Sequence, residues 1–259
     1  MAEAATRASS KLLASGFEKS LRPAVLGLCA ALLLSSGSAG ASNPYLEIPA
    51  PSEAAASRAY RYANMTNEAA YAELAARRIA FEAARPPLPG VRAPVRLRGP
   101  LHGVVVHSSL PAAERRTSSF EILDARLALA LDDFCELLAL HDVVELVHYT
   151  MYRPSVVREV SQGQTRHPGG LAIDVGALRK RSGRWIAVGP HWPSRVGAKT
   201  CGTGARELKS RPARELVSIV CEAADLRIFH YMLTPHFDEH HADHLHLEIK
   251  PAVKWFLVN

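Results

Sequence analysis

The sequence predicts an α+β fold in which a small antiparallel sheet packs against helices, preceded by a helical, proline-rich N-terminal extension. Residues 143–149 (VVELVHY), 227–233 (RIFHYML) and 244–249 (HLHLEI) have the aliphatic and aromatic composition of strands. Two other stretches repeat apolar residues every three or four positions, the spacing of helices with one buried face. Strands and helices of this kind predict one mixed core.

The first of these helices is predicted to begin at Ser118 or Ser119, either of which can cap it, and to run to about Leu140. The second is predicted to begin near Pro212, because proline is tolerated in the first turn of a helix. A short strand is expected at residues 104–106. The basic run 179–184 looks like a hairpin tip, with 185–188 as its return strand.

The chain begins with features of a secretory signal peptide, which we assign to residues 1–41. Basic residues come first, then the apolar run 24–34, then a small-residue stretch that ends in Ala39-Gly40-Ala41. An apolar run this short cannot cross the roughly 30 Å hydrocarbon core of a bilayer as a helix. We therefore expect an exported protein, periplasmic or secreted, with no stable membrane span after cleavage.

Residues 42–98 are predicted to form a linker and helical extension before the main domain at 99–259. The linker is rich in proline, serine and alanine up to about residue 56. A packing or spacer helix is expected at 66–84, where Thr66 favours a helix start and Pro86-Pro87 a helix end.

The net charge of the chain excludes few classes of function. The formal charge of +6 falls to about +4 once residues 1–41 are removed, because four basic and two acidic residues leave with them. Ordinary surface solvation accounts for this balance. Nothing indicates nucleic-acid binding, since aromatic and arginine residues are not interleaved. The sequence leaves the oligomeric state open.

Three cysteines remain after residue 41. In an exported protein Cys201 and Cys221 could form a disulfide, with Cys135 buried and reduced, although the odd count leaves the pairing open. None of the three has a partner at the C-x-x-C spacing of metal sites, so metal binding by cysteine is not expected.

Two histidine-rich segments carry the chemistry of the chain. His167 stands seven residues before Asp174, with Gly169-Gly170 between them to turn the chain back. Much later, His244 and His246 stand two apart in a predicted strand and so face the same side. Two imidazoles and a carboxylate can hold zinc in three of four tetrahedral positions. Either motif alone is more often structural or surface, but together they predict a zinc site on the sheet.

The joint pattern S-x-H-x-x-G-x-A-x-D, followed by D-H-x-H, resembles that of the metallopeptidases grouped with lysostaphin, the zinc D-alanyl-D-alanine carboxypeptidases and the hedgehog signalling domain. It is most similar to the bacterial extensin-like, carboxypeptidase-related branch of that group. The resemblance covers roughly residues 143–250, and Thr165 replaces the usual serine. It implies Zn²⁺ as cofactor and three metal ligands, which are His167, Asp174 and His246.

The resemblance also implies catalytic roles for Asp243, His244 and Arg153. Asp243, three residues before the last ligand, is expected to be the general base and His244 an electrostatic helper. Strand geometry favours His244 as the alternative general base. Residues two apart in a strand face the same side, so Asp243 would face away from His246 unless the strand begins only at His244. Arg153 is expected to hold a substrate carboxylate or carbonyl.

The resemblance, together with the predicted export, implies an exported zinc peptidase, of carboxypeptidase or murein endopeptidase type, that hydrolyses an amide bond in the stem or cross-link peptides of peptidoglycan. Two alternatives stay open. One is a catalytically inactive, metal-containing module that binds the cell wall. The other is a secreted protein that sequesters metal through the histidines of residues 236–246. For the peptidase, the resemblance implies that His236 lies near the metal, because murein endopeptidases of this kind place an extra histidine there.

Overall fold

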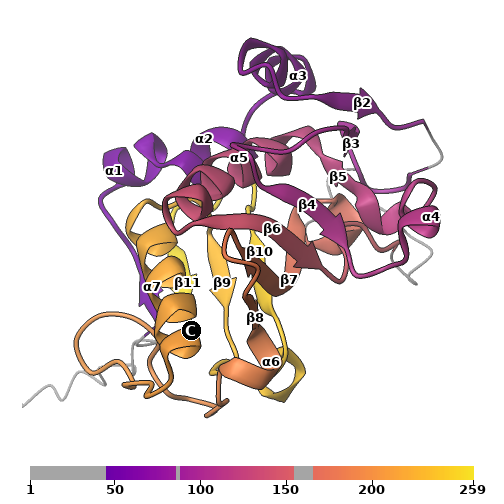
Figure 1. Ribbon diagram of the computed structural model, residues 1–259. Helices are drawn as coiled ribbons and strands as arrows, with labels where there is room; N and C mark the ends of the chain where they lie inside the picture. Colours follow the sequence, from indigo (N-terminus) through magenta and orange to yellow (C-terminus); the bar gives the residue numbers. More distant parts are fainter. Residues whose placement is uncertain (1–44, 86–87, 155–165) are drawn as a thin grey trace, which may run out of the picture. The chain divides into compact units, whose positions relative to one another are not determined.

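The computed structural model describes residues 45–85, 88–154 and 166–259, so the predicted signal peptide and Thr165 lie outside the described residues. A mixed α+β fold is confirmed, built around one large sheet (Figure 1). Along that sheet the strands run in the order β1 (Leu46–Glu47), β11 (Phe256–Val258), β9 (Tyr231–Leu233), β10 (Leu245–Glu248), β7 (Ala172–Lys180), β6 (Val143–His148) and β4 (Val105–Ser108). β8 (Trp185–Ala187) pairs with β7 as the predicted hairpin return.

The prediction of a small antiparallel sheet was wrong in size, and although most strand pairs of the large sheet are antiparallel, two are not. The sheet has eight strands, and β4 pairs with β6 in parallel, as β9 does with β11. A parallel pair requires a crossover connection. Between β4 and β6 that crossover contains α5 (Ala125–Leu140), whose presence the sequence indicated but whose topological role its periodicity does not encode.

The helix predicted from Ser118 or Ser119 begins later. Ser118 does act as a cap, but for a single 3-10 turn, Ser119–Glu121. Residues Ile122–Asp124 then form β5, and the Asp124 side chain accepts the Arg126 N–H to cap α5. The chain stays extended here because β5 pairs with β3 (Pro94–Leu97) in a second sheet that also includes β2 (Phe81–Ala83).

The helix predicted at 66–84 is likewise shorter. α3 (Asn67–Ala76) begins as expected, with the Thr66 hydroxyl accepting the Ala69 N–H. It ends where Arg78 adopts a left-handed conformation with φ 58°, after which the chain runs into β2. The composition of residues 66–84 favours a helix throughout. Residues 81–83 nevertheless form a strand, because Phe81 pairs with Leu97 in the second sheet.

The described residues of the segment 42–98, predicted as a linker and extension, lie in the same compact unit as the described residues of 99–259. α1 (Pro51–Ala56) and α2 (Arg58–Ala63) come before α3, and both α2 and α3 contact α5. Polar contacts reinforce this packing: Tyr62 donates to Asp133 at 2.6 Å, and Arg77 donates to the same carboxylate at 2.8 Å. The N-terminal helices therefore belong to the core of this unit.

α7 (Arg211–Asp225) begins as predicted, with Pro212 in its first turn and Ser210 as its cap, and it packs beside α5 (Figure 1). Cys221 on this helix forms a disulfide with Cys201, and Cys135 is buried and free, as expected. Within the described residues, no helix is both long enough and apolar enough to span a membrane.

Candidate metal centre

The centre of the large sheet brings together residues from the two histidine-rich segments. Asp174 lies on β7 and His246 on β10, and the two are direct partners across this antiparallel pair. Residues opposite each other in a sheet project to the same face, about 5 Å apart. Pairing of β7 with β10 therefore places the carboxylate beside one imidazole.

His167 reaches the same point from a 3-10 turn, His167–Gly169, that directly precedes β7. Gly170 ends the turn with φ 64°, and its N–H donates to the His167 carbonyl at 3.0 Å. A Cβ at position 170 would lie 2.9 Å from the backbone nitrogen of Asp124, so a side chain there has no room. The predicted sharp turn after His167 is thus found, and Gly170 is the residue that needs the special conformation.

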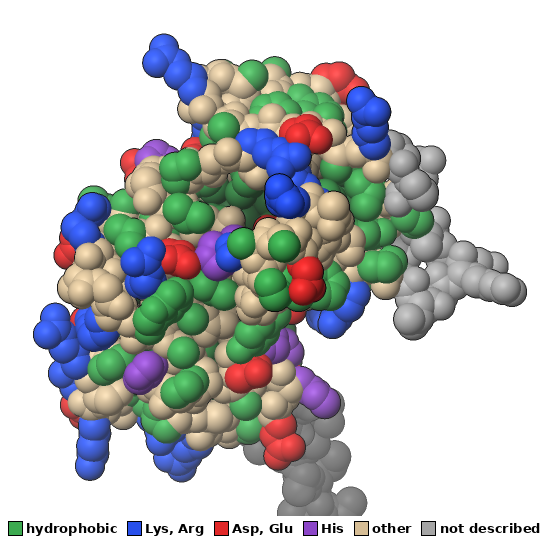
Figure 2. All heavy atoms as spheres, turned by 45° about the vertical axis from the view of Figure 1, so that its right-hand side comes forward, with side chains coloured by type: hydrophobic (Ala, Val, Ile, Leu, Met, Phe, Trp, Pro, Cys, Tyr) green, Lys and Arg blue, Asp and Glu red, His purple; other side chains and the backbone are tan. Residues whose placement is uncertain are grey.

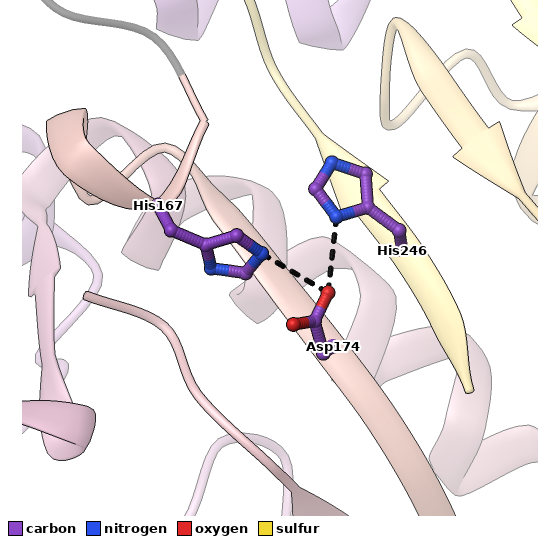
Figure 3. A group of neighbouring side chains, drawn as sticks. All are labelled: His167, Asp174 and His246. Carbon is purple, nitrogen blue, oxygen red and sulfur yellow. Dashed lines mark hydrogen bonds and ion pairs between the residues drawn. The ribbon is translucent and has the colours of Figure 1, made fainter. Parts of the chain in front are cut away.

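The three side chains converge on one atom (Figure 3). Asp174 Oδ1 lies 3.0 Å from His167 Nε2 and 3.0 Å from His246 Nδ1. All three residues are buried, and they form the one group of three possible metal-binding side chains found among the described residues. The predicted ligand set is therefore brought together in space.

The outer nitrogen of each ring also has an acceptor. His167 Nδ1 lies 3.1 Å from the Met151 carbonyl, and His246 Nε2 lies 3.3 Å from a carboxylate oxygen of Glu248. An acceptor at the outer nitrogen holds a proton there, which leaves the inner nitrogen of a neutral ring with a lone pair. Both inner nitrogens then present lone pairs to an oxygen that also has only lone pairs.

Such a meeting of three acceptors needs a positive charge between them, either a metal ion or an extra proton on an imidazole. Burial alone would raise the pKa of Asp174, but its close contacts with the imidazoles of His167 and His246 hold that pKa well below its usual range. Burial disfavours charge on His246, yet Asp174 and Glu248 raise its pKa. Two imidazole nitrogens and one carboxylate oxygen are a donor set that zinc accepts, so the residues fit a metal ion.

Asp243 and His244 form a hydrogen-bonded pair beside this cluster. His244 Nδ1 lies 2.8 Å from Asp243 Oδ1, and His244 Nε2 lies 3.6 Å from Asp174 Oδ1. β10 begins at Leu245, so both residues precede the strand and the strict alternation of a strand does not separate them. The His244 ring thus stands between the cluster and Asp243, whose side chain is 63% exposed.

A second pair of this kind was not foreseen. His241 Nδ1 lies 2.6 Å from Asp238 Oδ1, and the His241 ring centre lies 5.1 Å from that of His244. Asp238 caps the 3-10 turn Glu239–His241, a role for which the D-x-x-H spacing is a local signal. His236, which the resemblance implied would lie near the metal, is instead buried against Trp192 and does not line the cavity at the cluster.

This cavity has a volume of about 430 Å³, and Asp174 is the one carboxylate that the described residues contribute to its lining. Arg153, expected to contact substrate, is part of the wall, and Asp243 is not. The lining is otherwise basic or imidazole in character, which favours an anionic ligand. It consists of Arg153, Arg166, His167, Pro168, Asp174, His240, His241, His244 and His246.

Comparison with known proteins gives one match. A family model described as extensin-like protein C-terminus matches residues 71–257, which include His167, Asp174 and His246, the second sheet, the large sheet apart from β1 and the end of β11, and part of the segment predicted as an extension. Searches of curated proteins and of solved structures return no match.

Proposed function

The chain belongs to the extensin-like protein C-terminus family, and from that premise we propose that it is an exported zinc peptidase related to lysostaphin and the D-alanyl-D-alanine carboxypeptidases. One observation carries the proposal: two imidazole nitrogens and a carboxylate oxygen converge, with their outer positions held by acceptors, at the wall of an open cavity. Three protein donors beside a cavity are typical of catalytic rather than structural zinc sites.

A zinc ion held by His167, Asp174 and His246 supplies Lewis-acid chemistry, polarising a carbonyl and making a water molecule more acidic. The chain's own residues must then move protons and hold the substrate. His244 is suited to accept a proton, because its Nδ1–H donates to Asp243 and its Nε2 faces the cluster. Asp243 then orients that ring, so the two residues exchange the roles predicted from the family pattern.

The basic lining points to a substrate that carries carboxylates. Arg153 and Arg166 line the cavity, and a guanidinium can hold a carboxylate through two hydrogen bonds. Stem and cross-link peptides of peptidoglycan carry such groups next to the amide bonds to be cleaved. The Cys201–Cys221 disulfide supports an oxidising compartment, in agreement with export.

Digestion of purified murein tests the proposal. We expect released peptides, identified by mass spectrometry, that disappear with a chelator and return with zinc. His167→Ala should lose both metal and activity. His244→Ala should retain metal and lose at least about 100-fold in rate, because a positioned proton acceptor contributes typically that much.

The matched control is His141→Ala, which removes another histidine that pairs with a carboxylate, that of Glu222, away from the cavity. It should retain full activity. Product release that survives complete removal of metal would refute the proposal. Full activity in His244→Ala together with loss in Asp243→Ala would restore Asp243 as the base.

Metal stoichiometry separates this proposal from metal sequestration. The described residues contain one group of three metal-binding side chains, so we expect one tightly bound ion per chain. Measurement by atomic emission on the purified protein gives the number directly. More than one tightly bound ion, without murein hydrolysis, would favour sequestration through the histidines of residues 236–246.

A further inference from the structure

A second cavity, lined by residues of β3, β4 and α4 (Ala112–Arg115), has a volume of about 220 Å³ and shares no lining residue with the metal centre. We propose that it is an anion-binding site in which Arg96, Arg115 and Arg116 hold a phosphate group. This site goes beyond the proposed peptidase activity and does not depend on it. The assignment rests on which of the arginines in this cavity have a carboxylate partner and which do not.

Arg96 is held rigidly but is not neutralised. Its guanidinium donates to the Arg115 carbonyl at 2.9 Å and to the Ser118 carbonyl at 2.8 Å. Carbonyl groups fix the orientation of a guanidinium without removing its charge. The side chain is half-buried, and burial lowers the pKa of Arg96. A preorganised cation of this kind is available to an anion at little entropic cost.

Arg115 has an unused donor. Among the described residues its Nε is buried and has no hydrogen-bond partner. The buried Nε is not itself within reach of an anion, but its lack of a partner leaves this guanidinium incompletely balanced by the described part of the chain. The rest of the Arg115 side chain lines the cavity and is only half-buried. Arg116, the next residue, lines the same cavity and is exposed.

The other charges of this cavity are paired within the chain. Arg98 bonds to Glu82, and His107 Nε2 lies 2.7 Å from Glu145. Among the described residues Glu121 is the one acid in the lining, and its Oε1 accepts the Ser108 N–H at 2.8 Å. Its charge opposes the effect of burial on the pKa of Arg96 but makes no ion pair with it.

Its other oxygen faces His148 Nε2 at 3.7 Å. Within the part of the chain that the structure describes, no carboxylate lies within ion-pairing distance of Arg96, Arg115 or Arg116. Three cations therefore share one cavity without an ion-pair partner.

Phosphate fits this arrangement better than a single carboxylate does. A guanidinium matches phosphate through two parallel hydrogen bonds, and three such groups supply more donors than one planar carboxylate can accept. Figure 2, which turns the α4 side of Figure 1 forward, shows Lys and Arg side chains gathered next to a hollow. A cavity of about 220 Å³ has room for a phosphate and a small substituent.

Titration of the full chain with inorganic phosphate, at constant ionic strength and followed by calorimetry, tests the site. We expect saturable binding that is at least about tenfold weaker in Arg115→Gln and in Arg116→Gln. Arg116 is exposed, so its variant keeps the test valid if Arg115→Gln fails to fold. The control, Arg61→Gln, removes an exposed arginine of α2 and should bind phosphate like the wild type.

A parallel titration with acetate separates phosphate from carboxylate recognition, and acetate should bind at least about tenfold more weakly than phosphate. Three results would overturn the proposal: no saturable binding of phosphate by the wild type, binding unchanged in Arg116→Gln, or an equal loss in Arg61→Gln. Equal affinity for acetate and phosphate would overturn the assignment to phosphate.

Discussion

At the scale of single residues, the candidate metal centre depends on acceptors that would not touch a bound ion. Glu248 is fully buried, and its Oε2 accepts from His246 Nε2 at 3.3 Å. This contact decides which ring nitrogen carries the proton and therefore which one faces Asp174. Arg166 Nε, 3.5 Å from the same oxygen, adds a compensating charge.

Glu248→Gln is expected to weaken metal binding by about 10–100-fold, because an amide is a poorer acceptor than a carboxylate and can also donate. Competition with a chelator of known affinity measures the change. Glu136→Gln, an exposed glutamate on α5, should bind metal like the wild type. Wild-type affinity in Glu248→Gln would mean that the ring is held by packing alone.

His230 predicts a pH dependence of stability away from the metal ligands. Its Nε2 donates to the Val253 carbonyl and its Nδ1 accepts the Lys250 N–H, both at 3.0 Å. Burial lowers the pKa of His230 to about 4, and only the neutral ring can make both bonds. Because the folded pKa lies below the unfolded value, stability is fully present above pH 6.5 and falls between pH 6.5 and 4.

His230→Gln should therefore be less stable than the wild type at pH 7 and should lose less stability on acidification. The difference in slope is expected to be about 1 kcal/mol per pH unit across this window. Urea unfolding at several pH values measures it, with the exposed His102→Gln as control. Parallel curves for His230→Gln and the wild type would show that His230 does not titrate in this range.

At the scale of elements, the turn before β7 sets the position of one ligand. Gly170→Ala is expected to lower the free energy of unfolding by roughly 2–3 kcal/mol and to weaken metal binding, because both the left-handed backbone and the close approach to Asp124 oppose a side chain. Gly183→Ala is the matched control, since Gly183 has φ 86° and open space around it.

Gly183→Ala should cost only about 1 kcal/mol, the conformational part alone. Urea unfolding and metal titration of both variants give the comparison. If the two glycine variants lose the same stability and both retain metal affinity, the contact with Asp124 has no role in shaping the site.

Element boundaries also show what could be read from the sequence. β6, the β7–β8 hairpin and α7 were predicted because their own patterns specify them. The predicted start of α5 and the predicted end of α3 were wrong because the residues next to these helices form β5 and β2 instead. Both strands pair with β3, and that pairing joins segments that lie apart in the sequence. Local propensity does not contain such long-range pairing.

The residues of the candidate site also fall into those that the sequence predicted and those that it did not. His167, Asp174 and His246 were predicted from a pattern of spacings, and they do meet. Glu248 follows His246 by two residues, so the alternation of a strand could have placed both side chains on the same face. Its role as acceptor for the His246 ring depends on its burial, which the spacing does not reveal. His241 and Asp238 lie in a turn whose path is set by the strands on either side, which left their approach to the cavity unpredicted.

At the scale of the whole molecule, the Cys201–Cys221 disulfide ties the long segment after β8 to α7, across a sequence separation of 20 residues. A closed loop of this length stabilises a protein by about 3 kcal/mol, mainly by restricting the unfolded chain. The double variant Cys201→Ser/Cys221→Ser should lose about that much in urea unfolding.

Reductant should lower the stability of the wild type to that of the double variant and leave the double variant unchanged. A further drop of the double variant in reductant would mean that the loss has another source. Cys135 should not contribute, because it is buried and burial raises the pKa of its thiol.

The pairing of Asp174 with His246 across β7 and β10 has one more consequence. A shift of one residue between these strands would turn the carboxylate and the imidazole to opposite faces of the sheet. If an ion binds at the proposed site, only correctly aligned chains would load it, and a chain folded in the shifted alignment would stay empty. Metal content would then report how many chains have folded correctly, and loading would trap the native alignment after each round of unfolding.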